Sequence, residues 1–411
     1  MDIKKLSFSL VRYTVTQCQL FAPNLKKPYD IPVESISEII IDNDYENYYF
    51  PFFQISVDLP ATILRSIKDT PFENHISITI EAGYYDENLD GSTLKAKSKA
   101  KYISGKYLAF IDSQYRNLFD SNLEDAEKKE GYDLKESNPQ SNQVVSFALY
   151  DEQLLDAKDK VFNAVIGSGC LIDFVAFILN KASIKNVLIS PPNNYKTYAP
   201  FIITPIPAIE QLDRICNDYG LYDYDAMIYF GLDRNYILSN TATCNAYESN
   251  EYKTTYFYYS EIDSKFSSSG GCCKDNKEKA NYIIMPGQST IFKDSSFEAE
   301  NKLVAEKFNY IRNDDATVTV KDKTGEFHLV TSGDSSVKSV SNRIKSFSKT
   351  AIMSLRHVDL EMLTPNKQFN FLIEDKKYRK YSGSYILSRT VIVLAKEGNF
   401  FTPLIEASFR G

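Results

Sequence analysis

A β-rich α+β fold, with two antiparallel, tube-like β-barrel domains and a smaller α+β insert between them, is predicted by three features of the sequence. The chain has 411 residues, which is enough for two or three domains of ordinary size. It contains 29 Tyr and 26 Phe but no Trp, and aromatic rings pack well on pleated sheets. Apolar and polar residues alternate towards both ends of the chain, whereas helical spacing is concentrated in its middle.

Residues 1–145 are predicted to form the N-terminal β-barrel domain. Apolar residues alternate with polar ones in three segments, as expected of strands with one face towards solvent: 6–10, 53–57 and 76–80. A short helix is expected from Ala61 to Lys68, directly after Pro60. The charged segment 120–143 has few apolar residues, so we expect a polar surface loop there.

Residues 146–245 are predicted to form the α+β insert. Apolar residues recur at helical spacing from Leu171 to Ile178 and again from Ile209 to Tyr219. The Pro-rich stretch between them excludes a regular helix but leaves space for a short strand at 201–203. Residues 227–238 are typical of a hairpin-like pair of strands.

The remainder of the chain is predicted to return to strands. Residues 246–285 contain a Tyr-rich strand at 252–259 and a Ser/Gly-rich connection. Residues 286–411 are predicted to form the C-terminal β-barrel domain, in which the apolar run 385–394 completes the core.

The sequence predicts no catalytic, cofactor-binding or metal-binding residue. The three histidines, His75, His328 and His357, do not stand in the spacing of a zinc hydrolase, and no G-x-S-x-G segment presents a nucleophile. Gly167 and Gly169 precede a helix but lack the further residues of a phosphate-binding loop, so they predict a turn. Six scattered cysteines predict reduced thiols and no disulfide framework.

One segment resembles half of a calcium-binding loop. Asp86, Asn88 and Asp90 stand at the alternating positions from which oxygen ligands converge on a hard cation. The position of the bidentate glutamate is occupied by Lys97, whose charge repels a cation. A hairpin loop with solvated acids is therefore the favoured prediction, with a cation at these three residues as the alternative.

Charge and hydropathy exclude two further classes. A formal net charge of −7 argues against a protein built to neutralise duplex phosphates, because that affinity depends on clustered Lys and Arg. No apolar run approaches the roughly 18–20 residues that span a bilayer, so we expect no membrane insertion. The N-terminus is typical of a strand and not of a signal peptide, which predicts synthesis in a cytosol.

Two regions resemble the baseplate hub proteins of contractile-tailed bacteriophages, which link the tail tube to the central spike. The resemblance lies in a Pro-rich strand that leads to a helix, a Tyr-Gly pair and a hairpin, and in the segments that close the last barrel. The residues that carry it are Pro191–Tyr195, Pro205–Leu212, Tyr219–Tyr222, Ala226–Leu238, Val358–Leu360, Thr364–Lys367 and Tyr381–Tyr385.

The resemblance implies a structural, non-enzymatic role. Such hubs are homotrimers in which two related barrels per chain make a pseudo-sixfold ring, and this ring adapts a hexameric tail tube to a trimeric spike. The implied partners are the tail tube protein, the central spike protein and other baseplate proteins, while viral DNA passes through the lumen without specific binding. The implied location is the tail baseplate of the virion, part of a contractile injection system that assembles in the host cytoplasm.

Two alternatives remain open on the sequence alone. One is a hub-like tail protein with cell-wall lytic activity, which requires a catalytic cluster. The other is a β-rich receptor-binding or fibre protein, which requires an exposed receptor patch in place of a ring.

Overall fold

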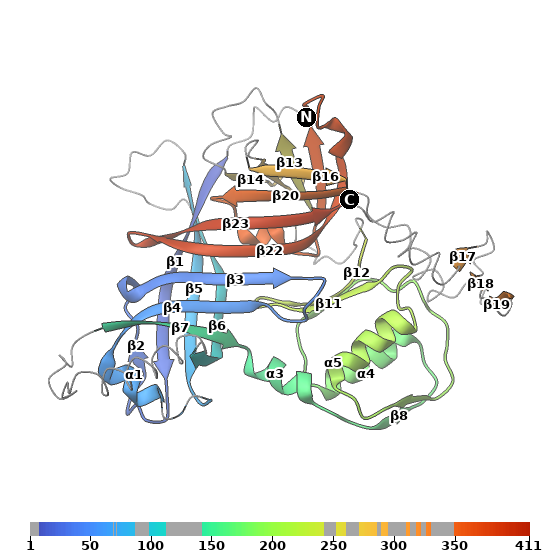
Figure 1. Ribbon diagram of the computed structural model, residues 1–411, viewed down its shortest axis with the longest axis horizontal. Helices are drawn as coiled ribbons and strands as arrows, with labels where there is room; N and C mark the ends of the chain where they lie inside the picture. The colour runs from blue at the N-terminus through green and yellow to red at the C-terminus, as the bar shows by residue number, and fades with distance from the viewer. Residues whose placement is uncertain are drawn as a thin grey trace, which may run out of the picture.

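The computed structural model describes residues 8–68, 70, 72–86, 98–111, 142–241, 252–259, 271–285, 289–294, 310–312, 318–321, 326–329 and 349–411. Figure 1 shows a broad stack of strands built from both ends of the chain, with a smaller unit that carries α4 and α5 beside it. The predicted β-rich character with few helices is confirmed.

Strands make up most of the described chain. Their bounds are β1 Ser9–Phe21, β2 Tyr29–Asp30, β3 Ile36–Asp44, β4 Phe52–Pro60, β5 His75–Asp86, β6 Ser98–Ile111, β7 Asn142–Tyr150, β8 Ala164–Ile166, β9 Val187–Ile189, β10 Phe201–Ile203, β11 Ala226–Phe230, β12 Asn235–Ser239, β13 Thr254–Tyr259, β14 Cys272–Asp275, β15 Ala280–Ile284, β16 Thr290–Asp294, β17 Tyr310–Arg312, β18 Val318–Lys321, β19 Glu326–Leu329, β20 Lys349–Arg356, β21 Gln368–Ile373, β22 Gly383–Glu397 and β23 Phe400–Arg410. The α-helices are α1 Ala61–Lys68, α3 Glu152–Asp159, α4 Leu171–Lys181 and α5 Ala208–Asp213, and α5 continues into the π-helical turn η3 Arg214–Asp218. Short 3-10 turns are η2 Val33–Ser35, η4 Leu360–Leu363 and η5 Arg379–Tyr381.

Fifteen strands form one sheet, in which strands from the two ends of the chain are hydrogen-bonded to each other. Eleven of them close into a barrel in the order β14-β15-β13-β21-β22-β3-β4-β7-β6-β5-β1, and the pair Ser9–Cys272 returns β1 to β14. The junction β3–β22 joins the N-terminal and C-terminal halves over seven residue pairs. The predicted N-terminal and C-terminal strand regions therefore share one hydrogen-bonded system.

Seven strands of this sheet lie side by side without interruption, in the order β7-β4-β3-β22-β23-β20-β16. Every junction in this series is antiparallel. In β4, for example, Phe53, Ile55 and Val57 are buried, whereas the side chains between them are only partly buried. The period of two in the sequence thus fixes which face of the sheet covers the core.

Aromatic rings fill the core under the C-terminal strands. Phe409 lies 5.1 Å from Phe257, 5.2 Å from Phe369 and 5.3 Å from Phe371 between ring centroids, each pair edge to face. Edge-to-face packing brings the positive ring edge to the negative ring face and adds to the gain from burial. The predicted use of the aromatic residues in strand packing is confirmed for these rings.

The insert has a separate core around α4 and α5. Leu171, Phe174, Val175 and Ile178 of α4 are buried on one face, as their helical spacing predicts. The predicted strand at 201–203 is β10, and the predicted hairpin is the pair β11–β12. Helix α3 and strands β8 and β9 were not predicted, because each is too short or too polar to show a clear apolar period.

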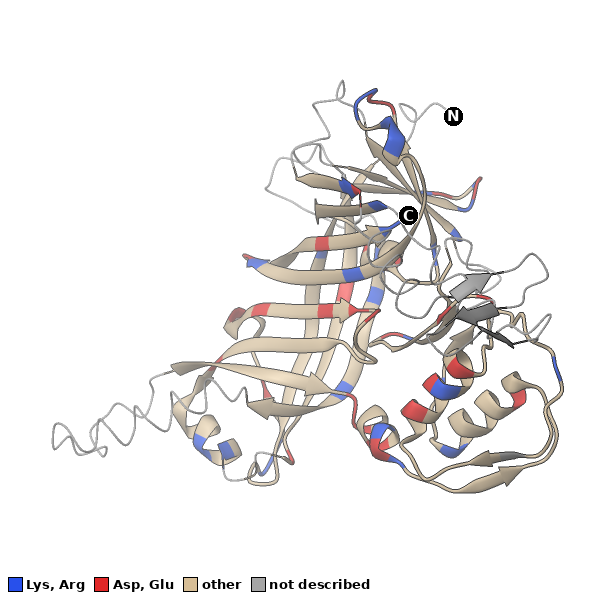
Figure 2. Cartoon of the chain, turned by 45° about the vertical axis from the view of Figure 1, so that its right-hand side comes forward, with Lys and Arg blue, Asp and Glu red and all other residues tan. Residues whose placement is uncertain are grey.

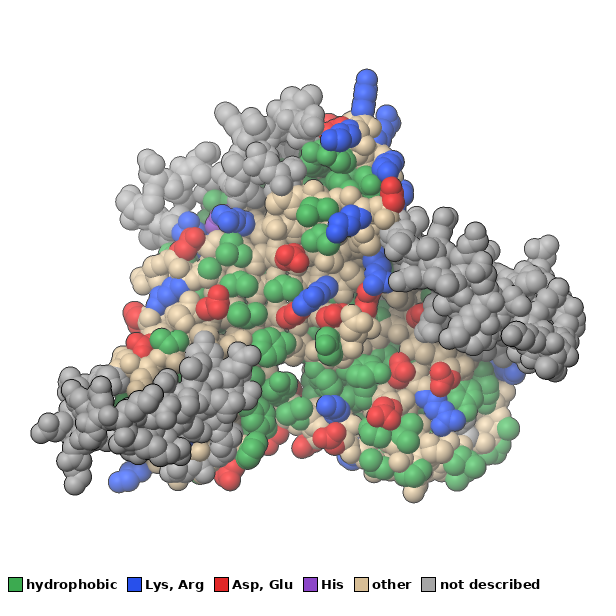
Figure 3. All heavy atoms as spheres, in the orientation of Figure 1, with side chains coloured by type: hydrophobic (Ala, Val, Ile, Leu, Met, Phe, Trp, Pro, Cys, Tyr) green, Lys and Arg blue, Asp and Glu red, His purple; other side chains and the backbone are tan. Residues whose placement is uncertain are grey.

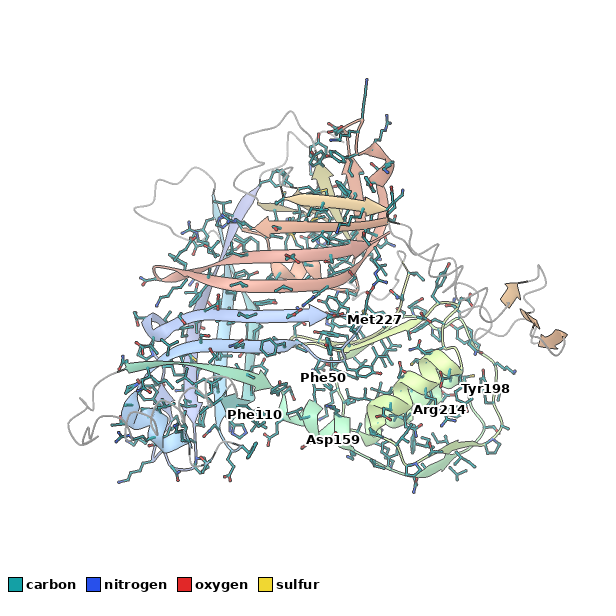
Figure 4. The ribbon with its side chains drawn as sticks, in the orientation of Figure 1. Phe50, Phe110, Asp159, Tyr198, Arg214 and Met227 are labelled. Carbon is teal, nitrogen blue, oxygen red and sulfur yellow. The ribbon has the colours of Figure 1, made fainter. Side chains whose placement is uncertain are left out.

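The hairpin β11–β12 joins the insert to the barrel. Tyr229 and Tyr236 pack in the barrel core, whereas Ile228 and Ile237 pack in the insert core. Successive side chains of a strand point to opposite faces, so both faces of this hairpin are buried. Figure 4 shows Met227 and Phe50 at the same junction, and Phe50 lies 5.7 Å from Phe230 between ring centroids.

Other predictions fall partly outside the described residues. Helix 61–68 is confirmed as α1. The predicted polar loop 120–143 overlaps the described chain only at Asn142 and Gln143, and here the prediction is wrong, because these residues pair with Pro60 and Leu59 at the start of β7. Residues 120–141 lie outside the described chain.

We predict that Tyr229→Phe lowers the free energy of unfolding by about 1–3 kcal/mol, the cost of a buried acceptor without a donor. The Tyr229 hydroxyl donates to Asn43 Oδ1 at 2.9 Å, and both side chains are buried. The matched control is Tyr224→Phe, because Tyr224 is 38% exposed, and its change should stay within about 0.5 kcal/mol. Urea unfolding of both variants measures the difference, and equal midpoints would contradict this role of the junction.

Candidate functional site

The solvent face of the seven-stranded sheet is an extended regular surface, and it faces the viewer in Figure 3. One row of cross-strand partners that crosses this face carries no charge. Its residues are Ala148, Gln54, Ile40, Val393 and Leu404. The face therefore combines aliphatic side chains with small polar ones.

Charges on this face are mixed in sign. Its carboxylates are Glu38, Asp42, Asp44, Asp58 and Glu406, and its cations are Lys293, Arg356, Arg389 and Arg410. Arg389 binds Asp42 with both ends of its guanidinium, at 3.0 Å from Nε and 2.6 Å from Nη2. Figure 2 shows both signs along these strands. The face has no cluster of Lys and Arg of the kind that binds duplex phosphates.

A buried ion pair lies beside the β1–β14 closure of the barrel. Lys274 of β14 lies 2.7 Å from Asp359, whose side chain is 1% exposed. The Lys274 ammonium also donates to the Tyr84 hydroxyl at 2.8 Å, and that hydroxyl donates to Asp359. Next to them the Tyr13 hydroxyl accepts from the Leu360 amide at 2.9 Å.

The environment holds this cluster in its charged, hydrogen-bonded form. Burial lowers the pKa of Lys274, but the charge of Asp359 and their hydrogen bond outweigh it, so the pKa lies above its ordinary value. Burial and the same carboxylate raise the pKa of Tyr84, which therefore stays a hydroxyl donor. The groups come from positions 84, 274 and 359, so no local sequence pattern could have predicted their meeting.

A small cavity of about 30 Å³ lies where the insert hairpin meets the barrel. It is lined by Asp233 at the turn of the hairpin and by Tyr45 and Tyr102 of the barrel. Burial raises the pKa of Asp233. The cavity has the size of one water molecule, so it does not hold a substrate.

A larger polar cleft of about 600 Å³ separates the loop 45–49 from the insert. Asp213, Asp218 and Asp225 line it, together with the ion pair of Glu46 and Arg410. Burial raises the pKa of Glu46, although Arg410 opposes this. Asp213 accepts a hydrogen bond from Asn217 at 2.7 Å. Glu46 and Asp213 already have polar partners, and no histidine lies among the residues that line the cleft.

The residues singled out in the sequence do not converge. His75 lies 3.3 Å from Glu152 at the surface, whereas His357 is a turn residue with φ of 56° and a pKa lowered by burial. Gly169 pairs with Tyr198 before α4, where the Asp173 carboxylate accepts from the Cys170 amide and would repel a phosphate.

Two further predictions concern the cysteines and the acidic loop. The Cys272 and Cys273 side chains are buried thiols, and burial raises the pKa of Cys272, so its thiol form is favoured. Of the three acidic-loop residues only Asp86 is described, at the end of β5, while Asn88 and Asp90 lie outside the described residues. Among the described residues, no three His, Cys, Asp or Glu side chains are grouped closely enough for a metal ion. In the same part of the chain, no helix has the length and hydropathy needed to cross a bilayer.

Comparison with known proteins places nearly the whole chain in one family. The sequence model of the family described as Bacteriophage PBS1 gene 109 protein matches residues 16–400. No curated protein matches the chain. The resemblance to a phage protein that the sequence carries is confirmed by the family match.

Several solved structures are similar to the chain over most of its length. The tail protein from Neisseria meningitidis MC58 has 10% identity and a TM-score of 0.48, with 97% of this chain and 96% of that chain covered. The 43 kDa tail protein of prophage MuSo2 from Shewanella oneidensis has 11% identity and a TM-score of 0.46, with 95% and 96% covered. The E. coli c3393 protein, a component of the type VI secretion system, has 8% identity and a TM-score of 0.35, with 94% and 76% covered. Because these TM-scores are below 0.5, the assignment of the chain to a family rests on the sequence-model match alone.

We predict that Lys274→Met lowers the free energy of unfolding by about 3 kcal/mol, because it leaves the Asp359 carboxylate buried without its cation. Glu361→Gln is the control, since Glu361 pairs with the same ammonium at 3.2 Å but is 52% exposed, and its change should stay below about 1 kcal/mol. Denaturant unfolding compares the two. Equal losses would show that the burial of Asp359 does not determine how much this cluster contributes to the free energy of unfolding.

Proposed function

The chain belongs to the bacteriophage PBS1 gene 109 protein family, and on that premise we propose that it is a structural hub of a phage tail baseplate. In this proposal the chain forms a homotrimer, and its ring adapts a hexameric tail tube to a trimeric central spike. Its partners are the tube protein, the spike protein and other baseplate proteins. It acts in the virion, after assembly in the host cytoplasm, and it catalyses no reaction.

The observation that carries this proposal is the shared sheet. The pairings form two closed circuits, β1-β5-β6-β7-β4-β3-β22-β23 and β1-β14-β15-β13-β21-β22-β23. They have β1, β22 and β23 in common. We take these circuits as two fused barrels, so that three copies would present six barrels and a pseudo-sixfold ring. The proposed domains are 1–145 and 286–411 for the barrels, 146–245 for the insert and 246–285 for the connection, whose strands β13, β14 and β15 complete the second circuit.

The seven-stranded sheet is suited to the wall of the channel in such a ring. Its charges are mixed and partly paired, as in Arg389 and Asp42, and the chain as a whole has a net charge of −7. A surface of this kind lets DNA pass without the phosphate contacts that would retain it.

The test of this proposal is the mass and shape of the purified full-length chain, alone and mixed with the tube and spike proteins from the same tail. We expect a species of three chains, ring-shaped by negative-stain electron microscopy, that binds the tube protein on one side and the spike protein on the other. A chain that stays monomeric and ignores both partners would overturn the proposal. Clearing of cell-wall material by the isolated chain would contradict the absence of catalysis.

A charge reversal tests the channel wall. Replacement of Glu38 and Glu406 by Lys on the sheet face should make the assembled ring retain duplex DNA at low salt, with binding that weakens steeply as salt rises. The control carries the same charge change on α3, at Glu152 and Asp156. Filter-binding titrations of the two variants measure the difference, and equal retention would argue that the sheet does not face the DNA.

A further inference from the structure

The connection between β21 and β22 carries four cations in five residues, Lys376, Lys377, Arg379 and Lys380. All four residues are exposed. A fifth cation comes from another strand, because the Lys349 ammonium of β20 donates to the Lys380 carbonyl at 2.6 Å. In Figure 2 blue segments gather on this loop, at the upper end of the molecule. We name residues 374–381 the basic loop, and it concentrates positive charge in a chain whose net charge is −7.

Hydrogen bonds hold the basic loop in one shape. Inside the loop, Asp375 Oδ1 accepts from the Lys377 amide at 2.7 Å. At its base, the Ile373 amide donates to Ser382 Oγ at 3.2 Å and joins the two ends of the loop. A loop that is ordered before it binds loses less conformational entropy when a partner arrives.

Aromatic rings brace the same loop from below. Phe292 of β16 stacks on Tyr381 with 4.7 Å between ring centroids and 12° between ring planes, and it lies 5.6 Å from Tyr378. The Lys380 ammonium lies 4.7 Å from the centroid of the Tyr381 ring, where the negative ring face attracts a cation. The rings therefore stabilise a group of like charges that would otherwise repel one another.

Two of the cations are available to a partner. Lys380 is already paired with Asp294 of β16, at 2.7 Å. Lys376 and Arg379 are exposed, and within the described chain neither side chain has an ion pair or a hydrogen bond. No neighbouring carboxylate from that part of the chain neutralises them, so their charge acts on whatever approaches the loop.

The geometry favours carboxylates over nucleic acid. Duplex affinity requires many phosphate contacts along the groove, whereas the basic loop presents its cations over a single turn. Unpaired bases bind by stacking on open aromatic faces, but the rings of this loop pack against one another. A guanidinium such as that of Arg379 binds a carboxylate with two parallel hydrogen bonds, as Arg389 does with Asp42.

We propose that the basic loop is a docking surface for an acidic segment of another protein, with Lys376 and Arg379 as its main contacts. The inference goes beyond the proposed hub function, because it holds whether or not the chain forms a ring. The two cations are three residues apart, so their Cα atoms lie at most about 10 Å from each other. Carboxylates two or three residues apart in an extended segment match that separation.

A charge reversal tests the docking surface. The probe is a fluorescein-labelled peptide of about ten glutamates, titrated with the full-length chain at low salt and followed by fluorescence anisotropy. Replacing both Lys376 and Arg379 by Glu should weaken binding about tenfold or more, because two charge-assisted contacts become repulsive. The control replaces Lys26 and Lys27 by Glu, an equal charge change at exposed residues between β1 and β2, far from the basic loop in Figure 1. Its affinity should stay within about twofold of the wild-type chain, and added salt should weaken binding throughout.

A neutral variant and two further probes complete the test. Replacing Lys376 and Arg379 by Gln removes the cations without adding repulsion, so it should also weaken binding, and it decides the matter if the Glu variant does not fold. A short DNA duplex and phosphatidylglycerol vesicles are titrated in parallel. The proposal is overturned if the peptide does not bind, if the control loses as much affinity, or if the duplex or the vesicles bind more tightly through the same two cations. A monomeric chain that binds the peptide would contradict the hub function and leave this inference standing.

Discussion

The pairing of β3 with β22 is the constraint on which the rest of this structure depends. It joins residues that are some 350 positions apart through seven residue pairs, from Glu38–Ala395 to Asp44–Arg389. Two side-chain contacts reinforce it, the Arg389–Asp42 ion pair on the solvent face and the Asn43–Thr390 hydrogen bond of 3.0 Å on the buried face. The loop-closure entropy of so long a separation is offset by burial on the core side of both strands.

This junction turns two strand regions into one surface. Without it, β7-β4-β3 and β22-β23-β20-β16 would be connected only through β1, by the pairs Tyr13–Phe401 and Ser9–Cys272. With it, a continuous face of seven strands extends across both barrel circuits.

The insert is also hydrogen-bonded to the β3–β22 junction. The Tyr229 hydroxyl of the hairpin reaches Asn43 of β3, which in turn donates to Thr390 of β22. Any rotation of the insert must therefore break a buried hydrogen bond next to the pair that holds the halves together. Elsewhere in the barrel, the Lys274–Asp359 pair lies beside the shorter β1–β14 closure, which in the described chain consists of the pair Ser9–Cys272. Side chains thus reinforce the places where backbone pairing is short or distant.

The sequence by itself determined the local structure, because local structure depends on periods that neighbouring residues display. Alternation predicted strands such as β4 and β5, helical spacing predicted α4, and Pro60 predicted the start of α1. The family resemblance was also present in the sequence, in the Pro-rich strand, the helix after it and the hairpin. Only the tertiary structure decided which strands are neighbours and which face of the sheet meets solvent. Those depend on contacts such as Asp42 with Arg389 and Lys274 with Asp359, whose partners are too far apart in the chain to leave a pattern within any local window.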